Sequence, residues 1–116
     1  MIEIQRERRG YDFVPTEATE WAKLYSTENV KAGEKLLVAH YFIGGMDWYV
    51  AEIDVEASLA FGYAMLRQGG DEWGYFSLDE LEKIAVHPIA VVERDLYWTP
   101  KPAREVLPPE AWDWGE

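Results

Sequence analysis

The sequence contains no cysteine and no long apolar run. The absence of cysteine excludes disulfide bonds, thiolate catalysis and zinc–cysteine sites, and it fits a reducing compartment. No apolar stretch approaches the roughly 18 residues that a membrane-spanning helix needs. Residues 1–10 are charged and lack the apolar segment of a secretory signal. We therefore expect a cytoplasmic protein that does not bind membranes.

Basic residues are also scarce. The chain has 11 Lys and Arg against 22 Asp and Glu, which gives a formal net charge of −11 at pH 7. This charge repels nucleic-acid phosphate, so we expect no direct nucleic-acid binding, and it favours partners with a basic surface. Between positions 47 and 82, Arg67 is the only basic residue. The acidic residues of this stretch are Asp47, Glu52, Asp54, Glu56, Asp71, Glu72, Asp79, Glu80 and Glu82.

Length and composition predict one domain. A chain of 116 residues has room for a single core, and it is 48% apolar and 15% aromatic, with six Trp and seven Tyr. There is no internal repeat. We expect one domain over 1–116, with an N-terminal arm or edge strand at 1–15. The stretch 103–116, rich in proline and acidic residues and containing Trp, is expected to be an extended tail.

Two segments carry helix signals. Thr16 precedes acidic residues, and apolar side chains then recur at helical spacing, which predicts a short helix at 17–26. Ser77 and Glu80 have the spacing of a capping box, in which each side chain accepts a hydrogen bond from the other residue's amide. The helix that follows is expected to continue until Pro88, where proline forbids it.

Five segments predict strands, at 35–43, 48–54, 59–65, 73–76 and 91–98. The first is apolar on both faces. In the third, large and small side chains alternate. In the second, alternation predicts Tyr49, Ala51 and Ile53 on one face and Trp48, Val50, Glu52 and Asp54 on the other. The order of elements indicates an α+β fold, a small antiparallel sheet of four to five strands with two short helices packed on one side.

No set of residues predicts catalysis or a cofactor. His40 lies in the middle of a strand and is expected to be a hydrogen-bonded structural histidine, and His87 is expected at a helix end. Arg94 stands between two acidic residues and is expected to form an internal ion pair that fixes the last strand. Glu52 and Asp54 share a strand face, which leaves a divalent-metal site as an alternative. We expect no bound metal and no cofactor.

Several short motifs together resemble one family. They are Leu24-Tyr25, the stretch 38–42, Trp48-Tyr49-Val50, Phe61-Gly62-Tyr63, the stretches 74–78 and 93–97, and Pro100-Lys101-Pro102. Over about residues 24–102 the chain resembles a bacterial domain-of-unknown-function family common on plasmids, conjugative elements and phages, often beside antirestriction genes. The resemblance implies a mobile-element setting, where small acidic proteins such as anti-CRISPR proteins inhibit host defence. It transfers no catalytic residue, and the arginine-rich arm and the tail lie outside it.

These observations favour a non-enzymatic, acidic protein-binding module. It would act as a counter-defence inhibitor that blocks the basic nucleic-acid groove of a host nuclease, either a CRISPR effector of the Cas9 type or a restriction nuclease. The alternatives are a metal-dependent hydrolase or nuclease that uses Glu52 and Asp54, and an accessory nucleic-acid-binding protein of plasmid transfer. Residues 52 and 54 should present carboxylates about 6.5–7 Å apart, a spacing comparable to that of phosphates. The candidate contact residues are Asp47, Glu52, Asp54, Glu56, Asp71, Glu72, Trp112 and Trp114.

Overall fold

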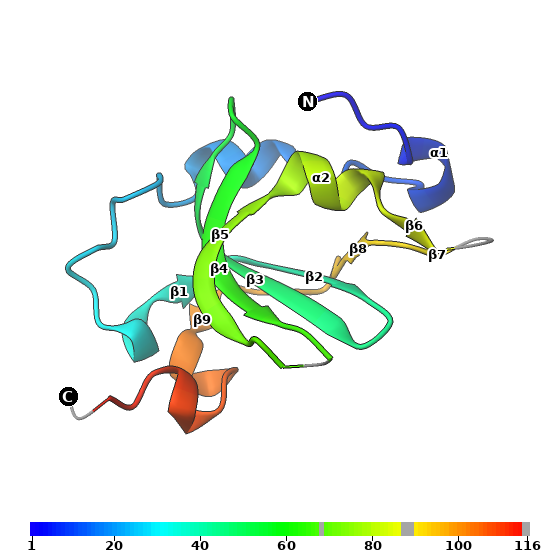
Figure 1. Cartoon of the computed structure of the whole chain (residues 1–116). Coiled ribbons are helices and arrows are strands. Elements are labelled where there is room, and N and C mark those ends of the chain that lie inside the picture. Colours follow the sequence, from blue (N-terminus) through cyan, green and yellow to red (C-terminus); the bar gives the residue numbers. More distant parts are fainter. Residues whose placement is uncertain (68, 87–89, 115–116) are drawn as a thin grey trace.

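A five-stranded antiparallel sheet forms the centre of the computed structural model, which describes residues 1–67, 69–86 and 90–114 (Figure 1). The strands lie in the order β5-β4-β3-β2-β8, and every neighbouring pair is antiparallel. Their bounds are β2 Ala39–Ile43, β3 Met46–Asp54, β4 Leu59–Met65, β5 Glu72–Ser77 and β8 Glu93–Arg94. The predicted α+β fold with a small antiparallel sheet is confirmed.

The other regular elements are short. Strand β1 Leu36–Leu37 pairs with β9 Lys101–Pro102, and β6 Ala85–Val86 pairs with β7 Ala90–Val91. The α-helices are α1 Arg6–Arg9 and α2 Leu78–Lys83, and the 3-10 turns are η1 Thr16–Glu20, η2 Ala32–Glu34, η3 Ala103–Glu105 and η4 Pro109–Ala111. Among the described residues, no helix is long and apolar enough to cross a membrane.

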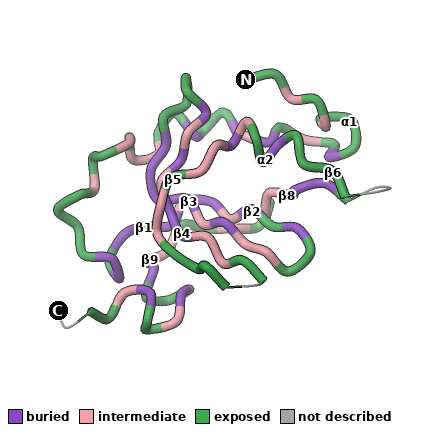
Figure 2. The backbone as a smooth tube through the Cα atoms, in the orientation of Figure 1, coloured by how far each residue is buried: buried purple, intermediate pink, exposed green. Residues whose placement is uncertain are grey.

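The sheet has a hydrophobic core on each of its faces (Figure 2). On one face, α2, η1 and the N-terminal segment bury Phe13, Tyr41 and Leu78. On the other face, η3 and η4 cover the sheet and bury Tyr63 and Leu107. The predicted extended tail is therefore wrong for its described part. The predicted arm or edge strand at 1–15 is a packed segment that contains α1.

The sequence pattern of β4 is confirmed. Phe61, Tyr63 and Met65 contribute to the core under η3 and η4, whereas Ala60 and Ala64 contribute to the core under α2. The small residues on the second face allow the covering segment to lie close to the sheet.

Strand β3 departs from simple alternation. Its register with β4 shifts between Val50 and Glu52, where Ala51 is an additional residue in the strand. Such a bulge reverses the facing of the residues that follow it. Ile53 therefore joins Val50 in the core under α2, and the prediction that it would face the same side as Tyr49 is wrong.

The predicted helix at 17–26 is also wrong. The chain forms only η1, and Trp21 is already extended with φ −72° and ψ 159°. Beyond it the chain runs beside β3, because the Ile53 amide donates to the Ala22 carbonyl at 2.9 Å and the Leu24 amide donates to the Ile53 carbonyl at 3.3 Å. Pairing with a strand satisfies the backbone groups that a helix would satisfy internally, so tertiary contact overrides local propensity.

Three predicted elements are shorter than expected. Strand 35–43 is divided at Val38, whose amide donates to the Val50 carbonyl at 2.8 Å while β1 and β2 pair with different strands. Strand 91–98 is reduced to the two-residue strands β7 and β8. Helix α2 ends at Lys83, because Ile84 is extended and leads into β6. His87 and Pro88 lie outside the described residues.

Gly62 provides a test of the sheet. A Cβ atom at Gly62 would lie 1.7 Å from the Tyr49 carbonyl oxygen, whereas one at Gly74, its partner on β5, would have no atom within 4 Å. We predict that Gly62→Ala lowers the free energy of unfolding by more than about 2 kcal/mol, because the backbones must separate. Gly74→Ala should leave it unchanged or raise it by up to about 1 kcal/mol. Urea unfolding followed by Trp fluorescence compares the two, and equal losses would contradict the packing.

The cap of α2 provides a second test. The Ser77 hydroxyl accepts from the Glu80 amide at 3.1 Å, so this half of the predicted capping box is confirmed. We predict that Ser77→Ala lowers the free energy of unfolding by about 1 kcal/mol. Ser26→Ala, at an exposed turn position, is the matched control and should have no measurable effect. If both variants unfold at the wild-type urea midpoint, the cap does not stabilise the domain.

Candidate functional site

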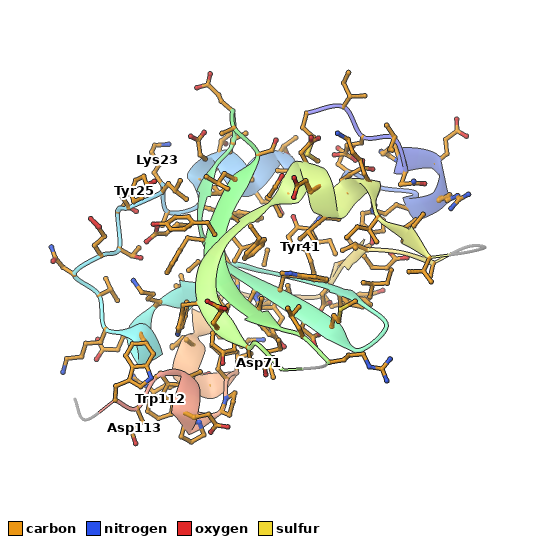
Figure 3. The ribbon with its side chains drawn as sticks, in the orientation of Figure 1. Lys23, Tyr25, Tyr41, Asp71, Trp112 and Asp113 are labelled. Carbon is orange, nitrogen blue, oxygen red and sulfur yellow. The ribbon has the colours of Figure 1, made fainter. Side chains whose placement is uncertain are left out.

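The predicted acidic contact residues do not lie on one surface. In the β3–β4 register Asp47 stands opposite Met65 and Asp54 stands opposite Leu59, so the two aspartates mark opposite ends of this hairpin. Asp71 lies near the Asp47 end, at the lower edge of the sheet in Figure 3, and Glu72 begins β5. Glu56 follows Asp54 in the turn at the other end. The acidic residues therefore form two separate groups.

Two of these acidic residues stabilise turns. The Asp54 carboxylate accepts from the Ala57 amide at 3.1 Å, and the Asp71 carboxylate accepts from the Leu66 amide at 2.8 Å. The Asp47 carboxylate accepts from His40 Nε2 at 2.7 Å. Glu56 and Glu72 are exposed. Only part of the predicted set is therefore free to contact a partner.

Glu52 is buried, with 2% of its surface exposed. Its carboxylate accepts from the Tyr25 amide at 2.7 Å, from the Thr27 amide at 3.1 Å and from the Thr27 hydroxyl. Lys35 lies beside it and donates to the Thr27 carbonyl at 2.5 Å. Burial lowers the pKa of Lys35, and the nearby charges of Glu52 and Glu28 oppose that shift. Glu52 thus anchors the loop 25–27, and the expected exposed row of carboxylates at 52 and 54 is not formed.

This anchor places an exposed tyrosine on the sheet. Tyr25 has a φ of 70°, a left-handed conformation that costs energy for a non-glycine residue, and its amide is held by Glu52. Its ring is 58% exposed and lies 5.9 Å from the ring of Tyr75 on β5, which is 53% exposed. Figure 3 shows Tyr25 on the loop to the left of the sheet. The pKa of Tyr75 is raised, first by burial and then by Tyr25, Glu52 and Glu28.

The two tyrosines continue into an aromatic groove. The Tyr75 ring is 5.1 Å from that of Phe61, which stacks on Trp73 at 5.9 Å. Phe61, Trp73 and Trp114 line an open groove of about 410 Å³ together with Val30, Lys31 and Glu28. The Trp73 indole donates to the Ala111 carbonyl at 2.8 Å, which fixes its orientation. We call the exposed rings of Tyr25, Tyr75 and Trp114, together with the half-buried rings of Phe61 and Trp73, the aromatic surface.

The two tail tryptophans have different environments. Trp112 donates to the Leu107 carbonyl at 3.0 Å, and its ring packs so closely that a Cβ atom at Gly33 would be 3.1 Å away. Trp114 is 60% exposed. Trp112 is therefore a packing residue, whereas Trp114 belongs to the aromatic surface. Neither Tyr25 nor Tyr75 was identified from the sequence as a contact residue. Tyr75 could have been identified, because its strand is flanked by acidic residues and contains no Lys or Pro, a composition that indicates an accessible edge strand.

Two of the three N-terminal arginines form ion pairs within the chain. Arg9 is buried and pairs with the fully buried Glu82 at 3.0 Å, and its Nε donates to the Val92 carbonyl at 2.9 Å. Arg6 pairs with Asp12 at 3.0 Å. Arg9 is therefore part of the core packing, whereas Arg6 forms an ion pair at the surface and Arg8 is exposed.

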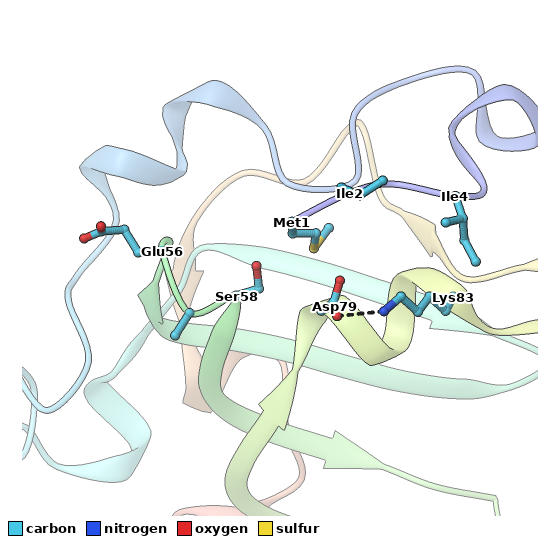
Figure 4. A pocket seen from close by; sticks show the side chains of 8 residues that line it. Met1, Ile2, Ile4, Glu56, Ser58, Asp79 and Lys83 are labelled. Atoms are coloured by element: carbon cyan, nitrogen blue, oxygen red, sulfur yellow. Dashed lines mark hydrogen bonds and ion pairs between the residues drawn. The ribbon is translucent and has the colours of Figure 1, made fainter.

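A second hollow, of about 500 Å³, lies between the N-terminal residues and α2 (Figure 4). Exposed Met1, Ile2 and Ile4 line it. Opposite them, Lys83 pairs with Asp79 at 2.9 Å. The exposed Glu56 also lines the hollow.

His40 has the structural role that its position predicts. It lies between two carboxylates, Asp47 at 2.7 Å from Nε2 and Asp95 at 3.5 Å from Nδ1, and it stacks on Tyr49 with ring centres 4.6 Å apart. Burial, followed by the charges of Asp47 and Asp95, raises the pKa of Tyr49 to about 12. In the described part of the chain, no three His, Cys, Asp or Glu residues are grouped so that they could hold a metal ion.

Arg94 departs from the predicted ion pair. Its guanidinium donates to two backbone carbonyls, of Phe13 at 3.1 Å and of Asp12 at 2.7 Å. The neighbouring Glu93 accepts from the Tyr11 hydroxyl, and burial together with this bond raises the pKa of Tyr11 to about 12. Strand β8 is thus fixed to the N-terminal segment by side-chain to backbone bonds.

The anchoring role of Glu52 can be measured. We predict that Glu52→Gln lowers the free energy of unfolding by about 2 kcal/mol. The glutamine side chain has the same shape as glutamate, but it loses the charge-assisted hydrogen bonds, and its NH₂ group faces the backbone N–H groups of Tyr25 or Thr27. Glu56→Gln, an exposed neighbour with the same change in charge, should change it by less than about 0.5 kcal/mol. Urea unfolding of both variants is the measurement, and a Glu52→Gln variant as stable as Glu56→Gln would contradict the anchor.

Comparison with known proteins identifies the family and no closer relative. No curated protein and no solved structure is similar enough to this chain to match it. Residues 18–106 match the family described as "Protein of unknown function (DUF2958)". This range contains β1 to β9, Glu52 and the loop that it anchors, and all of the aromatic surface except Trp114. The chain therefore belongs to the DUF2958 family.

Proposed function

We propose that this chain is a non-enzymatic binding module that docks on a basic surface of a partner protein. More specifically, we propose that the protein is a counter-defence inhibitor carried by a mobile genetic element, and that it blocks the nucleic-acid groove of a host nuclease. A CRISPR effector or a restriction nuclease is the kind of target that such a groove implies. The observation that carries the proposal is the excess of acidic over basic side chains on the described surface.

Exposed acidic side chains occur on most elements of the described surface, and they include Glu7, Glu17, Glu20, Glu28, Glu34, Asp54, Glu56, Glu72, Glu80, Glu105, Glu110 and Asp113. Several cations, by contrast, are held inside the fold. Arg9 and Lys35 are buried, and Arg94 binds backbone carbonyls. Lys101 lies over the Trp98 ring at 4.0 Å. A basic groove would meet a surface of predominantly negative charge.

The same contacts weigh against the two alternatives. A metal-dependent hydrolase was expected to use Glu52 and Asp54, but the Glu52 oxygens accept bonds from the 25–27 loop and Asp54 caps a turn. An accessory nucleic-acid-binding protein needs free basic residues, whereas Arg9 is committed to Glu82 and Arg6 pairs with Asp12. Both observations support binding to protein in preference to chemistry or direct nucleic-acid contact.

The proposal predicts inhibition of a nuclease without binding of DNA. We expect the purified chain to inhibit a CRISPR effector of the Cas9 type or a restriction enzyme in cleavage assays, and to give no gel shift with duplex DNA at physiological salt. Inhibition should weaken as salt is raised, because charge complementarity is screened. A DNA shift that survives added salt, or failure to inhibit either nuclease class, would contradict the proposal.

Two double variants, each of which removes two carboxylate charges, test which acidic group contacts the nuclease. Asp71→Asn/Glu72→Gln and Asp54→Asn/Glu56→Gln each remove two charges, and each asparagine retains the oxygen that caps a turn. Because Glu72 adjoins the aromatic surface, the first pair should weaken inhibition roughly fivefold and the second pair less. Equal losses would show that net charge alone matters.

A further inference from the structure

We propose that the outer edge of β5 binds an extended, cationic segment of the partner protein by strand addition. This inference rests on the proposed function, because it takes the partner to be a protein with a basic surface. It adds the binding mode, in which a backbone ladder provides affinity and alternate side chains provide specificity.

The first argument is that β5 is an open and regular edge. It is the outermost strand of the sheet (Figure 1). It pairs with β4 without a register shift, from Leu59 opposite Ser77 to Ala64 opposite Glu72. Within the described residues, no backbone hydrogen bond joins 72–77 to any segment other than β4. Edge strands are normally protected by Lys, Pro, a bulge or very short length. β5 has six residues and none of these features.

The opposite edge of the sheet is very short, and part of its backbone is already hydrogen-bonded. β8 has two residues, and the Arg94 amide donates to the Tyr11 hydroxyl of the N-terminal segment at 3.0 Å. Of the two ends of the sheet, β5 is therefore the one that offers backbone groups to a further strand.

The second argument is the aromatic surface beside this edge. Trp73 and Tyr75 alternate onto one side of β5, and Tyr25 lies against Tyr75 at 5.9 Å. Exposed tyrosine and tryptophan rings contribute most to binding at protein interfaces and also attract Arg and Lys side chains. On the other face of the strand, a Cβ atom at Gly74 would have no atom within 4 Å, so that face has room for side chains of an added strand.

The third argument is charge. Asp71 and Glu72 stand at the beginning of β5, the exposed Glu80 follows its end, and no Lys or Arg occurs from 68 to 82. An added strand with Arg or Lys at alternate positions would meet carboxylates at both ends and rings between them. A second copy of this chain fits poorly, because pairing two β5 edges would bring these acidic residues together in molecules of charge −11.

The test uses capped eight-residue peptides that alternate Arg with Val, with Glu-Val peptides as the charge control. A third peptide has the Arg-Val sequence with alternate backbone nitrogens methylated, so that it cannot complete a ladder. Binding is measured by calorimetry, and amide hydrogen exchange of the full chain is followed by NMR. We expect the Arg-Val peptide alone to bind and to slow exchange at alternate residues of 72–77, a signature that non-specific charge attraction does not produce.

Variants of the aromatic surface complete the test. Tyr75→Ala should weaken peptide binding about tenfold and Tyr75→Phe much less, since the ring provides the contact. Tyr97→Ala, which removes a 93% exposed ring elsewhere, should change nothing. Unchanged exchange in β5 at saturating peptide, or equal binding of the methylated or Glu-Val peptide, would overturn the proposal. So would a dimer in sedimentation with β5 already protected, which would make a second copy the occupant.

The peptide experiment contains no nuclease, so its result is independent of the nuclease assays. Peptide binding without nuclease inhibition would contradict the proposed nuclease target but support strand addition at β5. Nuclease inhibition without peptide binding would contradict strand addition at β5 but support the proposed function.

Discussion

Buried carboxylates hold the irregular segments of this chain against its sheet. Glu82 accepts from the Ile4 and Gln5 amides, and Glu52 accepts from the amides of the 25–27 loop. Glu3 is used in the same way and accepts from the Phe13 amide. A buried amide without a partner costs about 1–3 kcal/mol, and a carboxylate can satisfy several amides at once. Long segments can therefore pack on the sheet without forming helices of their own.

This arrangement also explains why burial does not reduce the negative surface charge. The buried charged residues among those described are Glu52 and Glu82 on one side and Arg9 and Lys35 on the other. Since each sign is buried equally, the charge imbalance of the whole sequence is expressed at the surface. The surface of the folded molecule therefore carries the full net charge of −11, which is available to steer a basic partner.

The elements that could be predicted from sequence are those whose determinants are local. Alternation predicted β4, and the spacing of Ser77 and Glu80 predicted the start of α2. The segment 17–26 could not be predicted, because its backbone pairs with Ile53, far along the chain. The burial of Glu52 was hidden for the same reason. The Glu52 carboxylate binds the amides of Tyr25 and Thr27, which lie far from it in the sequence. The bulge at Ala51, which turns Glu52 to the other face of the sheet, is not visible in the pattern of residues.

The candidate site follows from these non-local contacts. Trp114 could be named from the sequence as an accessible tail residue, but the place of Tyr25 beside Tyr75 depends on Glu52 holding a left-handed backbone. Because the fold already carries the cost of that conformation, the ring is positioned before any partner arrives. A partner that docks there loses less free energy to the ordering of side chains and loops. In the proposed binding mode, the buried Glu52 therefore contributes to recognition indirectly, because it fixes Tyr25 beside the open strand β5.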